Sequence, residues 1–540
     1  TDAKNPLHDL LLRILVTDLS AHIHGASPKS LQHLILSEPS NCSVFVSQWS
    51  NDIQRFQSFH TLSGMVAKEL KIKDLLINTP GEALAETFTF EEVERKVLST
   101  LRDTLISKDP FNHDDFRDLI RQRRDGVWGH MKIADSSDDN PYDLAYQALE
   151  AALELFALKD KHAEGFSFPG ISEMFNAYTA ELHLFDAYHR RFMAAADQIE
   201  FVGWDILKNL RETVSDCYEN WFLDQISSSW GSLIEGTGDS SFLKQWRIDK
   251  VWNQQDFYDR AVKPILDKNP RHRVFVIISD ALRYEAATEL TTKLNHNARF
   301  KASLSALLGV VPSYTALGMA SLLPHKSVKF SESGSLEIDG APCNSFLDRN
   351  QILLKNEGLA LKADDMLAMS QQEGRDTVQN ARVVYIYHDK IDSIGDKAAT
   401  EKQTPKAVAT AIEELAAIVR YVINVLNGAF VFVTADHGFI FQDKPLSATD
   451  KSELTKKPEN AFIAKKRYVV GRDLKKTAKA WHGFTRDTAN TDDDTEFWIP
   501  KGNNRFHFVG GAQFVHGGAM LQEIVVPLIK IKVIDSRSPD

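Results

Sequence analysis

Carboxylate and imidazole side chains follow several apolar runs in the second half of this 540-residue chain. Asp436 and His437 come directly after the run 429–433, in the sequence Thr-Ala-Asp-His-Gly. A continuous apolar run of this kind is typical of a buried parallel strand. Open α/β sheets bind their ligands beyond the carboxyl ends of such strands. Carboxylate oxygen and imidazole nitrogen are ligands of divalent cations. The alternative is a plain turn in which Asp acts as a cap and Gly takes a left-handed conformation.

The same pattern recurs after other apolar runs. Asp280 follows one run rich in Val and Ile, and the pair Asp392 and Asp396 comes shortly after another. Near the end of the chain, His516 follows Phe-Val and precedes Gly-Gly. One carboxylate past a strand is commonplace, but several within one span predict a shared site at the C-terminal edge of a sheet.

The spacing of these residues favours metal binding. Asp392 and Asp396 lie four positions apart, so on a helix or tight turn they share one face. Two carboxylates held so close repel each other unless a cation lies between them. The alternative is a solvated helical face with Lys390 and Lys397 as counter-charges. Two divalent ions with three protein ligands each would use all six candidates, which are Asp280, Asp392, Asp396, Asp436, His437 and His516.

A hydroxyl-bearing segment lies between these candidate ligands in the sequence. Pro312 and Ser313 predict the start of a helix, where a hydroxyl faces backbone N–H groups that suit a phosphate. A nearby metal would lower the pKa of such a hydroxyl and make it a nucleophile. The alternative is that Ser313 is an ordinary helix cap.

Residues 271–534 resemble the PglZ domain, a branch of the alkaline phosphatase superfamily. Five short motifs carry the resemblance, in this order: 280–285, 312–315, 392–396, 434–438 and 515–518. The resemblance implies an α/β alkaline-phosphatase-like domain, which is a mostly parallel sheet flanked by helices.

The resemblance also implies a role for each motif residue. Asp280, Asp436 and His437 match the residues that hold one metal together with the nucleophile hydroxyl. The nucleophile position matches Thr315 best and Ser313 second.

Asp392, Asp396 and His516 match the residues that hold the second metal. The wider superfamily has a histidine where this chain has Asp396. The two ions are expected to be Zn²⁺ or Mn²⁺, with Mg²⁺ as a further candidate. The additional carboxylate of Asp396 favours the harder ions Mn²⁺ or Mg²⁺ over Zn²⁺.

Together these features predict a metal-dependent hydrolase of phosphoesters. Two ions can clamp a phosphoryl group from both sides while a threonine oxygen or a water attacks it. Arg283 is a candidate for bidentate contact with the phosphate, and an ion pair with Glu285 or Asp280 is its alternative role.

PglZ proteins belong to BREX phage-defence systems. The resemblance therefore implies a phosphodiesterase or nuclease that acts on DNA or a nucleotide beside a DNA methyltransferase and other BREX subunits. Two alternatives stay open: a phosphomonoesterase, or a catalytically weak or inactive subunit that serves as a scaffold or senses a nucleotide.

The densest basic segment contains Lys465, Lys466 and Arg467, interleaved with aromatic residues. Such a mixture can contact a phosphate backbone or nucleic acid, whereas a solvated charged face is its ordinary alternative. The net charge of −11 argues against broad wrapping by nucleic acid.

Composition and patterning divide the chain into two parts. Residues 1–265 are expected to be mainly helical, with two sub-domains that split near 165–170, and residues 270–535 form the predicted catalytic domain. Three scattered cysteines fit a reducing cytoplasm, and no apolar stretch reaches the length of a membrane span. A first residue other than Met indicates a fragment or a processed product.

Overall fold

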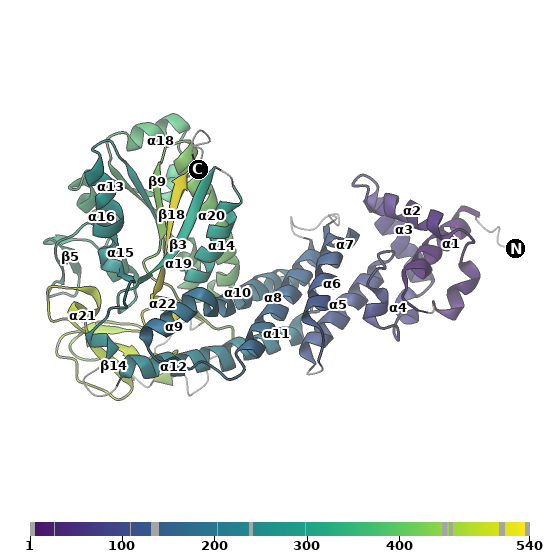
Figure 1. The fold of residues 1–540 in the computed structure, drawn as a ribbon, viewed down its shortest axis with the longest axis horizontal. Helices are drawn as coiled ribbons and strands as arrows, with labels where there is room; N and C mark the ends of the chain where they lie inside the picture. Colours follow the sequence, from purple (N-terminus) through teal and green to yellow (C-terminus); the bar gives the residue numbers. More distant parts are fainter. Residues whose placement is uncertain are drawn as a thin grey trace. The chain divides into compact units, whose positions relative to one another are not determined.

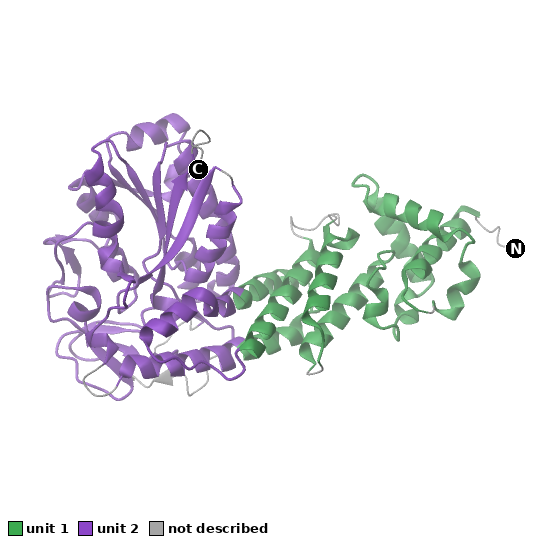
Figure 2. Cartoon of the chain, viewed as in Figure 1, with its two compact units in different colours: residues 1–161, 188–217 green, residues 162–187, 218–540 purple. Residues whose placement is uncertain are grey.

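The chain is described by a computed structural model. It covers residues 6–25, 27–107, 110–130, 140–201, 203–236, 241–297, 299–444, 451–452, 457–506 and 513–534. The chain forms two compact units (Figure 2): unit 1 comprises residues 1–161 and 188–217, and unit 2 comprises residues 162–187 and 218–540. No described helix is both long and apolar enough to cross a membrane.

Unit 1 is built from helices, which confirms the predicted helical region. Helix α5 shows why this sequence forms helices, because Val93, Val97 and Leu101 recur every four residues and are all buried. The helices of this unit include α1 (Pro6–His22), α2 (Pro39–Ser50), α3 (Phe56–Glu69), α4 (Ile72–Leu75), α5 (Glu91–Ile106), α6 (His113–Asp125), α7 (Val127–His130), α8 (Pro141–Lys161), α11 (Lys208–Ser215) and most of α10 (His183–Phe201).

Unit 2 is built around a seven-stranded sheet with the order β1-β3-β18-β9-β2-β8-β7. Strands β9, β2, β8 and β7 are parallel neighbours, β1 is parallel to β3, and β18 runs antiparallel to both β3 and β9. The strands are β1 (Trp252–Asn253), β2 (Val274–Ser279), β3 (Phe300–Leu308), β7 (Gly358–Lys362), β8 (Val383–His388), β9 (Phe430–Thr434) and β18 (Val525–Val533). This mostly parallel sheet confirms the predicted α/β fold class.

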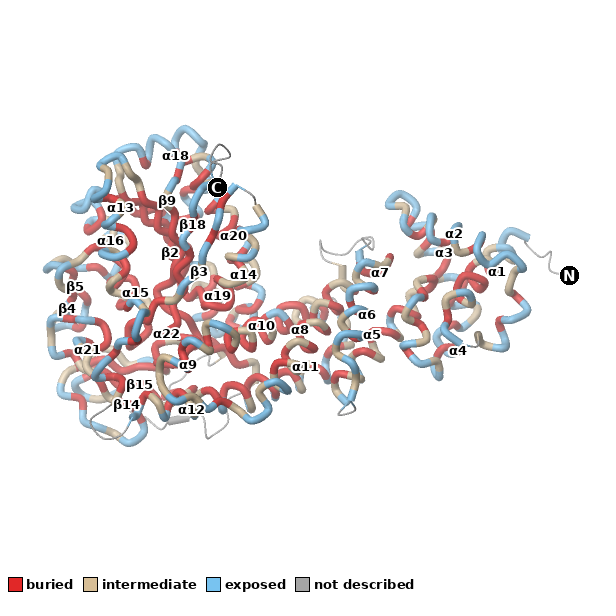
Figure 3. The backbone as a smooth tube through the Cα atoms, in the orientation of Figure 1, coloured by how far each residue is buried: buried red, intermediate tan, exposed pale blue. Residues whose placement is uncertain are grey.

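The centre of the sheet is completely buried, and helices cover both of its faces (Figures 1 and 3). Every residue of β2 and β8 is buried, which explains their continuous apolar sequence. Helices α14 (Tyr284–Asn295) and α20 (Thr404–Asn424) pack against each other on one side of the sheet. Helices α13 (Lys263–Lys268), α15 (Thr315–Leu322) and α16 (Phe346–Leu354) lie on the other side.

A smaller antiparallel sheet has the strand order β12-β13-β15-β14. It consists of β12 (Ala461–Ala464), β13 (Val469–Gly471), β14 (Ala480–Phe484) and β15 (Glu496–Pro500), and it has its own apolar core. Strand β17 (Phe514–Val515) pairs with β10 (Ile440–Phe441), which brings the segment after β17 close to the end of β9.

The boundary between the units differs from the predicted domain boundary at 265–270. Residues 162–187 and 218–268 belong to the same compact unit as the α/β sheet. Within that unit, the indole of Trp230 donates a 2.7 Å hydrogen bond to the carbonyl of Ala519. Part of the helical region is therefore packed into the α/β unit. Residue 535, the predicted end of the catalytic domain, lies outside the described residues.

Candidate metal centre

The turn after β2 places Asp280 at the C-terminal edge of the sheet. The Asp280 N–H donates to the carbonyl of His388 at 2.8 Å, which continues the β2–β8 pairing by one residue. Ala281 then adopts a left-handed conformation with φ of 62°, and its N–H donates to Asp436 Oδ1 at 3.1 Å. Backbone strain of this kind concentrates at functional sites.

Asp436 and His437 follow β9 and lie beside Asp280. The His437 Nδ1 is 2.9 Å from the Gly438 carbonyl, so this nitrogen carries the proton. The unprotonated Nε2 then faces the carboxylates, 3.6 Å from Asp280 Oδ1 and 3.4 Å from Asp436 Oδ2. This is the orientation in which a histidine binds a metal.

Two overlapping groups of side chains have ligand atoms within 4.8 Å of one another. Asp280, Asp436 and His437 form the first group, and Asp392, His437 and His516 form the second. The rings of His437 and His516 are stacked with centroids 4.1 Å apart, and His516 Nε2 is 3.8 Å from Asp392 Oδ1. Five of the six predicted ligands therefore meet, although they come from widely separated parts of the sequence.

The carboxylates of this cluster include buried oxygen atoms without hydrogen-bond partners. Asp280 Oδ1, Asp392 Oδ1 and Asp436 Oδ2 are buried and have no hydrogen-bond partner among the described residues. Buried polar atoms in proteins are normally paired, and an unpaired carboxylate oxygen is costly. Oxygen and imidazole donors that converge in this way fit a divalent cation.

The electrostatics of the cluster point in the same direction. Burial and the neighbouring carboxylates raise the pKa of Asp280, and burial raises the pKa of Asp436 to about 7. Burial and the neighbouring His516 lower the pKa of His437. A bound cation would compensate the negative charge that accumulates here.

Thr315 is the first residue of α15 and lies next to the cluster. Its Oγ1 is 3.1 Å from His437 Nε2, and its side chain is partly exposed. Helix α15 packs closely on the site, because a Cβ added at Gly318 would lie 2.2 Å from the Asp436 carbonyl oxygen. The hydroxyl is thus held at a helix N-terminus, where backbone N–H groups favour an anion.

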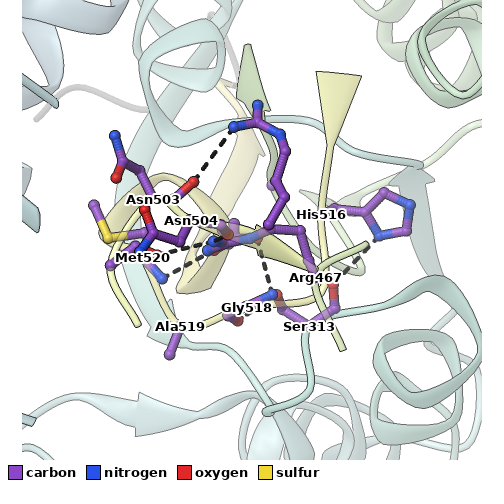
Figure 4. Close-up of polar contacts among 12 residues, drawn as sticks. Ser313, Arg467, Asn503, Asn504, His516, Gly518, Ala519 and Met520 are labelled. Atoms are coloured by element: carbon purple, nitrogen blue, oxygen red, sulfur yellow. Dashed lines mark hydrogen bonds and ion pairs between the residues drawn. The ribbon is translucent and has the colours of Figure 1, made fainter. Parts of the chain in front are cut away.

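Ser313 is buried and supports the segment that carries His516 (Figure 4). Its hydroxyl donates to the Gly518 carbonyl at 2.7 Å, and its N–H donates to the Gly517 carbonyl at 3.3 Å. Its own carbonyl lies 3.4 Å from His516 Nδ1. Because its hydroxyl is engaged in this way, Ser313 suits a positioning role better than that of a nucleophile.

Asp396 is exposed and belongs to neither group of ligand atoms. Its N–H donates to the Asp392 carbonyl at 2.9 Å, as the expected i, i+4 spacing requires. Burial raises the pKa values of Asp392 and Tyr468, and the charge of Asp396 adds to both shifts. Asp396 therefore lies at the rim of the cluster.

Arg283 does not face the cluster. Its guanidinium is buried, donates to Glu285 Oε1 at 2.8 Å, lies 3.8 Å from Asp186 and stacks over the ring of Phe439. This geometry matches the ion-pair alternative and not a phosphate contact, because the donors are already engaged away from the metal ligands.

The basic segment is divided by the fold. Arg467 is fully buried, and its Nε and Nη2 donate to Glu523 at 3.0 and 2.6 Å. Glu523 also accepts from the Gly518 N–H at 2.9 Å, so this ion pair fixes the turn after His516. Arg467 is therefore inaccessible to nucleic acid, whereas Lys465 is exposed and Lys466 is half-buried.

Sequence reasoning missed the supporting role of Glu523. A signal for it exists, since Gln522 and Glu523 interrupt an otherwise apolar run from 519 to 529. A carboxylate in such a run requires a buried partner. The identity of that partner as Arg467 depends on tertiary structure.

The chain matches a known protein family and two curated relatives. The family model described as "BREX system PglZ alkaline phosphatase-like domain" matches residues 257–531. The chain is 37% identical over 540 residues to the alkaline phosphatase-like protein BrxZ of Escherichia coli O9:H4 (strain HS), covering 99% of this chain and 61% of that protein. It is 33% identical over 536 residues to the alkaline phosphatase-like protein PglZ of Bacillus cereus (strain H3081.97), covering 98% of this chain and 60% of that protein.

The chain is also similar to solved structures. Murine ectonucleotide pyrophosphatase/phosphodiesterase 5 matches with a TM-score of 0.34 and 10% identity, over 48% of this chain and 88% of that chain. Phosphonoacetate hydrolase from Sinorhizobium meliloti 1021 matches with a TM-score of 0.32 and 12% identity, over 50% of this chain and 92% of that chain.

Proposed function

Because the chain belongs to the PglZ family of alkaline phosphatase-like proteins, we propose that it is a metal-dependent phosphodiesterase of a BREX phage-defence system. The chain spans about three fifths of the length of the curated relatives it matches, at 61% and 60%. The observation that carries the proposal is the cluster of Asp280, Asp392, Asp436, His437 and His516, with three buried carboxylate oxygens that lack partners.

The ligand set fits two divalent cations. Asp280, Asp436 and His437 would hold one ion, and Asp392 and His516 would hold the other. The mixture of carboxylates and imidazoles suits Zn²⁺ or Mn²⁺ better than Mg²⁺. When bound, such ions polarise phosphoryl oxygens and lower the pKa of a nearby hydroxyl.

Thr315 is the proposed nucleophile. Its oxygen attacks phosphorus, the bond from phosphorus to one alcohol breaks, and that alcohol leaves with the proton of the threonine hydroxyl. The intermediate is a phosphothreonine ester that keeps the second alcohol, and water then cleaves its threonine–phosphorus linkage to release a phosphomonoester. The N-terminus of α15 stabilises negative charge on the phosphoryl oxygens. Ser313 and the pair Arg467–Glu523 hold His516 in place during these steps.

Arg283 is not the proposed phosphate contact, because its guanidinium is paired with Glu285. A diester is the proposed substrate, and a monoester is the comparison in the assay below.

Chromogenic esters test this proposal. Chain stripped of metal with a chelator is assayed with bis(p-nitrophenyl) phosphate and with p-nitrophenyl phosphate, before and after addition of Mn²⁺, Zn²⁺ or Mg²⁺. We expect metal-dependent turnover of the diester, and a loss of about 100-fold or more in kcat for Thr315→Ala with metal binding retained. Thr377→Ala, an exposed helical threonine, is the matched control and should keep full activity.

Each other outcome selects an alternative. Metal binding without turnover of either ester would support a scaffolding or nucleotide-sensing subunit. Faster turnover of the monoester would indicate a phosphomonoesterase. Nicking of supercoiled plasmid by the metal-loaded chain, absent in Thr315→Ala, would identify DNA as a substrate.

A further inference from the structure

A cavity of about 580 Å³ lies beside the candidate metal centre, at the same edge of the seven-stranded sheet. Asp280 forms part of its wall, and so does Met319, which lies one helical turn after Thr315 on α15. Cavities of this size accommodate small-molecule ligands. A group bound in this cavity can therefore belong to the same molecule as a phosphate held next to Thr315.

The cavity is lined by two aromatic rings, and a cation lies over each of them. Phe346, the first residue of α16, meets Tyr387 edge to face with ring centroids 5.9 Å apart. The Arg349 guanidinium lies 4.9 Å from the centroid of Tyr387, and Lys362 Nζ lies 5.6 Å from that of Phe346. Neither cation forms an ion pair with any residue that the structure describes.

Polar groups at this wall also lack partners. The Tyr387 hydroxyl and the Arg349 Nε are buried, and neither forms a hydrogen bond of good geometry in the described part of the chain, although the guanidinium lies close enough to Tyr387 to influence its pKa. Burial raises the pKa of Tyr387, an effect that the nearby guanidinium opposes, so the phenol stays a neutral donor. Unpaired buried donors next to a cavity indicate a polar ligand rather than an apolar one.

We propose that this cavity binds the nucleoside portion of a phosphodiester whose phosphate occupies the candidate metal centre. The base packs on the Phe346 and Tyr387 rings with Arg349 as a cationic neighbour. The exposed carboxylates of Asp364 and Asp389, at the rim of the cavity, accept hydrogen bonds from sugar hydroxyls. This inference rests on the proposed phosphodiesterase function and adds the substrate class, which is a nucleotide diester.

The mixed chemistry of the wall selects this class of ligand. An inorganic anion would make no use of the two rings, and a purely apolar group would make no use of the cations Arg349 and Lys362. A nucleoside presents a flat aromatic face, ring nitrogens and hydroxyls together. It therefore complements the rings, the cations and the rim carboxylates at once.

Two diesters with the same leaving group test the inference. Thymidine 5′-(p-nitrophenyl phosphate) and methyl p-nitrophenyl phosphate both release p-nitrophenolate and differ only in the nucleoside. We expect the metal-loaded full chain to have a kcat/KM higher by roughly tenfold or more for the nucleoside ester, as expected for one stacked base. Phe346→Ala should lose this preference, mainly through a higher KM for the nucleoside ester.

Matched variants separate the ring from the stability of its helix. Phe346→Tyr keeps a ring and should keep the preference. Leu347→Ala alters the next residue of α16, whose side chain is 70% exposed and outside the cavity wall, and should behave like the unaltered chain. If Phe346→Ala fails to fold by circular dichroism, Arg349→Met takes its place in the same comparison.

The outcomes distinguish this inference from the proposed function. Turnover of both esters with the same ratio in the unaltered chain and in Phe346→Ala would overturn the nucleoside cavity and leave the phosphodiesterase standing. If neither ester is hydrolysed, the proposed function fails, and calorimetric binding of thymidine 5′-monophosphate decides the cavity alone. Binding that weakens roughly tenfold in Phe346→Ala would then support it, whereas absent or unchanged binding would overturn it.

Discussion

At the residue scale, Asp436 connects stability to metal binding. Burial raises its pKa to about 7 in the metal-free chain, well above the value of an unfolded aspartate. A carboxyl group whose pKa is raised by folding stabilises the folded state while protonated, and this contribution is lost as the pH rises through about 7. Asp436→Asn should therefore raise the melting temperature of the metal-free chain at pH 8, by roughly a few degrees, and have a smaller effect at pH 5.

Addition of metal should reverse the order of the two melting temperatures, so that the unaltered chain becomes more stable than Asp436→Asn. Mn²⁺ or Zn²⁺ is expected to stabilise the unaltered chain and to have little effect on Asp436→Asn, which lacks one anionic ligand. Differential scanning fluorimetry at the two pH values, with and without metal, measures both effects. Equal stabilisation of the two proteins by metal would show that Asp436 is not a ligand.

Residue types predicted the members of the metal cluster better than they predicted its supporting residues. Asp280, Asp436 and His437 stand directly after strands, so their place at the sheet edge follows from the sequence. Arg283 and Arg467 have the same chemistry as phosphate-binding arginines, but each is buried against a glutamate. That difference depends on which carboxylate lies nearby in space, and neither spacing nor composition contains this information.

At the scale of elements, the position of α15 sets the position of the proposed nucleophile. Gly318 lets this helix approach the Asp436 backbone, because an added Cβ would lie 2.2 Å from the carbonyl oxygen of Asp436 and 2.8 Å from its carbonyl carbon. Backbone atoms cannot yield as a flexible side chain can. Gly318→Ala should therefore displace Thr315 or the Asp436 turn and lower kcat at least about tenfold, because small misplacements of reacting groups are costly.

Gly64→Ala is the control for this substitution. Gly64 lies inside α3, where an added Cβ meets nothing within 4 Å. Alanine there should stabilise the chain by about 0.5–1 kcal/mol through helix propensity and leave activity unchanged. Normal activity in Gly318→Ala would mean that α15 can shift without cost to the site.

Strands were predictable where the sequence is continuously apolar. The runs before Asp280, His388 and Asp436 correspond to β2, β8 and β9, which are buried on both faces. The apolar segment after His516 is less simple, because it begins with the short helix α22 (Leu521–Ile524) and continues as β18. Its apolar pattern alone does not distinguish the two, since short buried helices and strands share it.

At the scale of the whole molecule, part of the helical region belongs to the α/β unit for a physical reason. The carboxylate of Asp186 accepts hydrogen bonds from Tyr178 and Tyr218 at 2.7 and 2.5 Å, and it lies 3.8 Å from Arg283. All four side chains are buried. The sequence pattern showed helices here, but it could not show that their polar residues satisfy an arginine located only three positions after Asp280.

This arrangement predicts where the chain can be divided. A fragment that starts at residue 270 lacks Asp186 and leaves Arg283 with one fewer buried acidic neighbour. Loss of one member of a buried ion pair typically costs about 3–5 kcal/mol.

A fragment 162–540 keeps Asp186. In it, residues 188–217 can be replaced by a short Gly/Ser linker, because the rings of Phe185 and Phe222 stack 4.3 Å apart and so place the two cut ends close together. We expect the longer fragment to melt cooperatively and bind Mn²⁺, and the shorter one to lose both properties when followed by circular dichroism and calorimetry. If the fragment from residue 270 were as stable and bound metal as tightly, the contacts of Asp186 would contribute nothing to the α/β unit, and the predicted boundary at 265–270 would describe the molecule better than the compact units do.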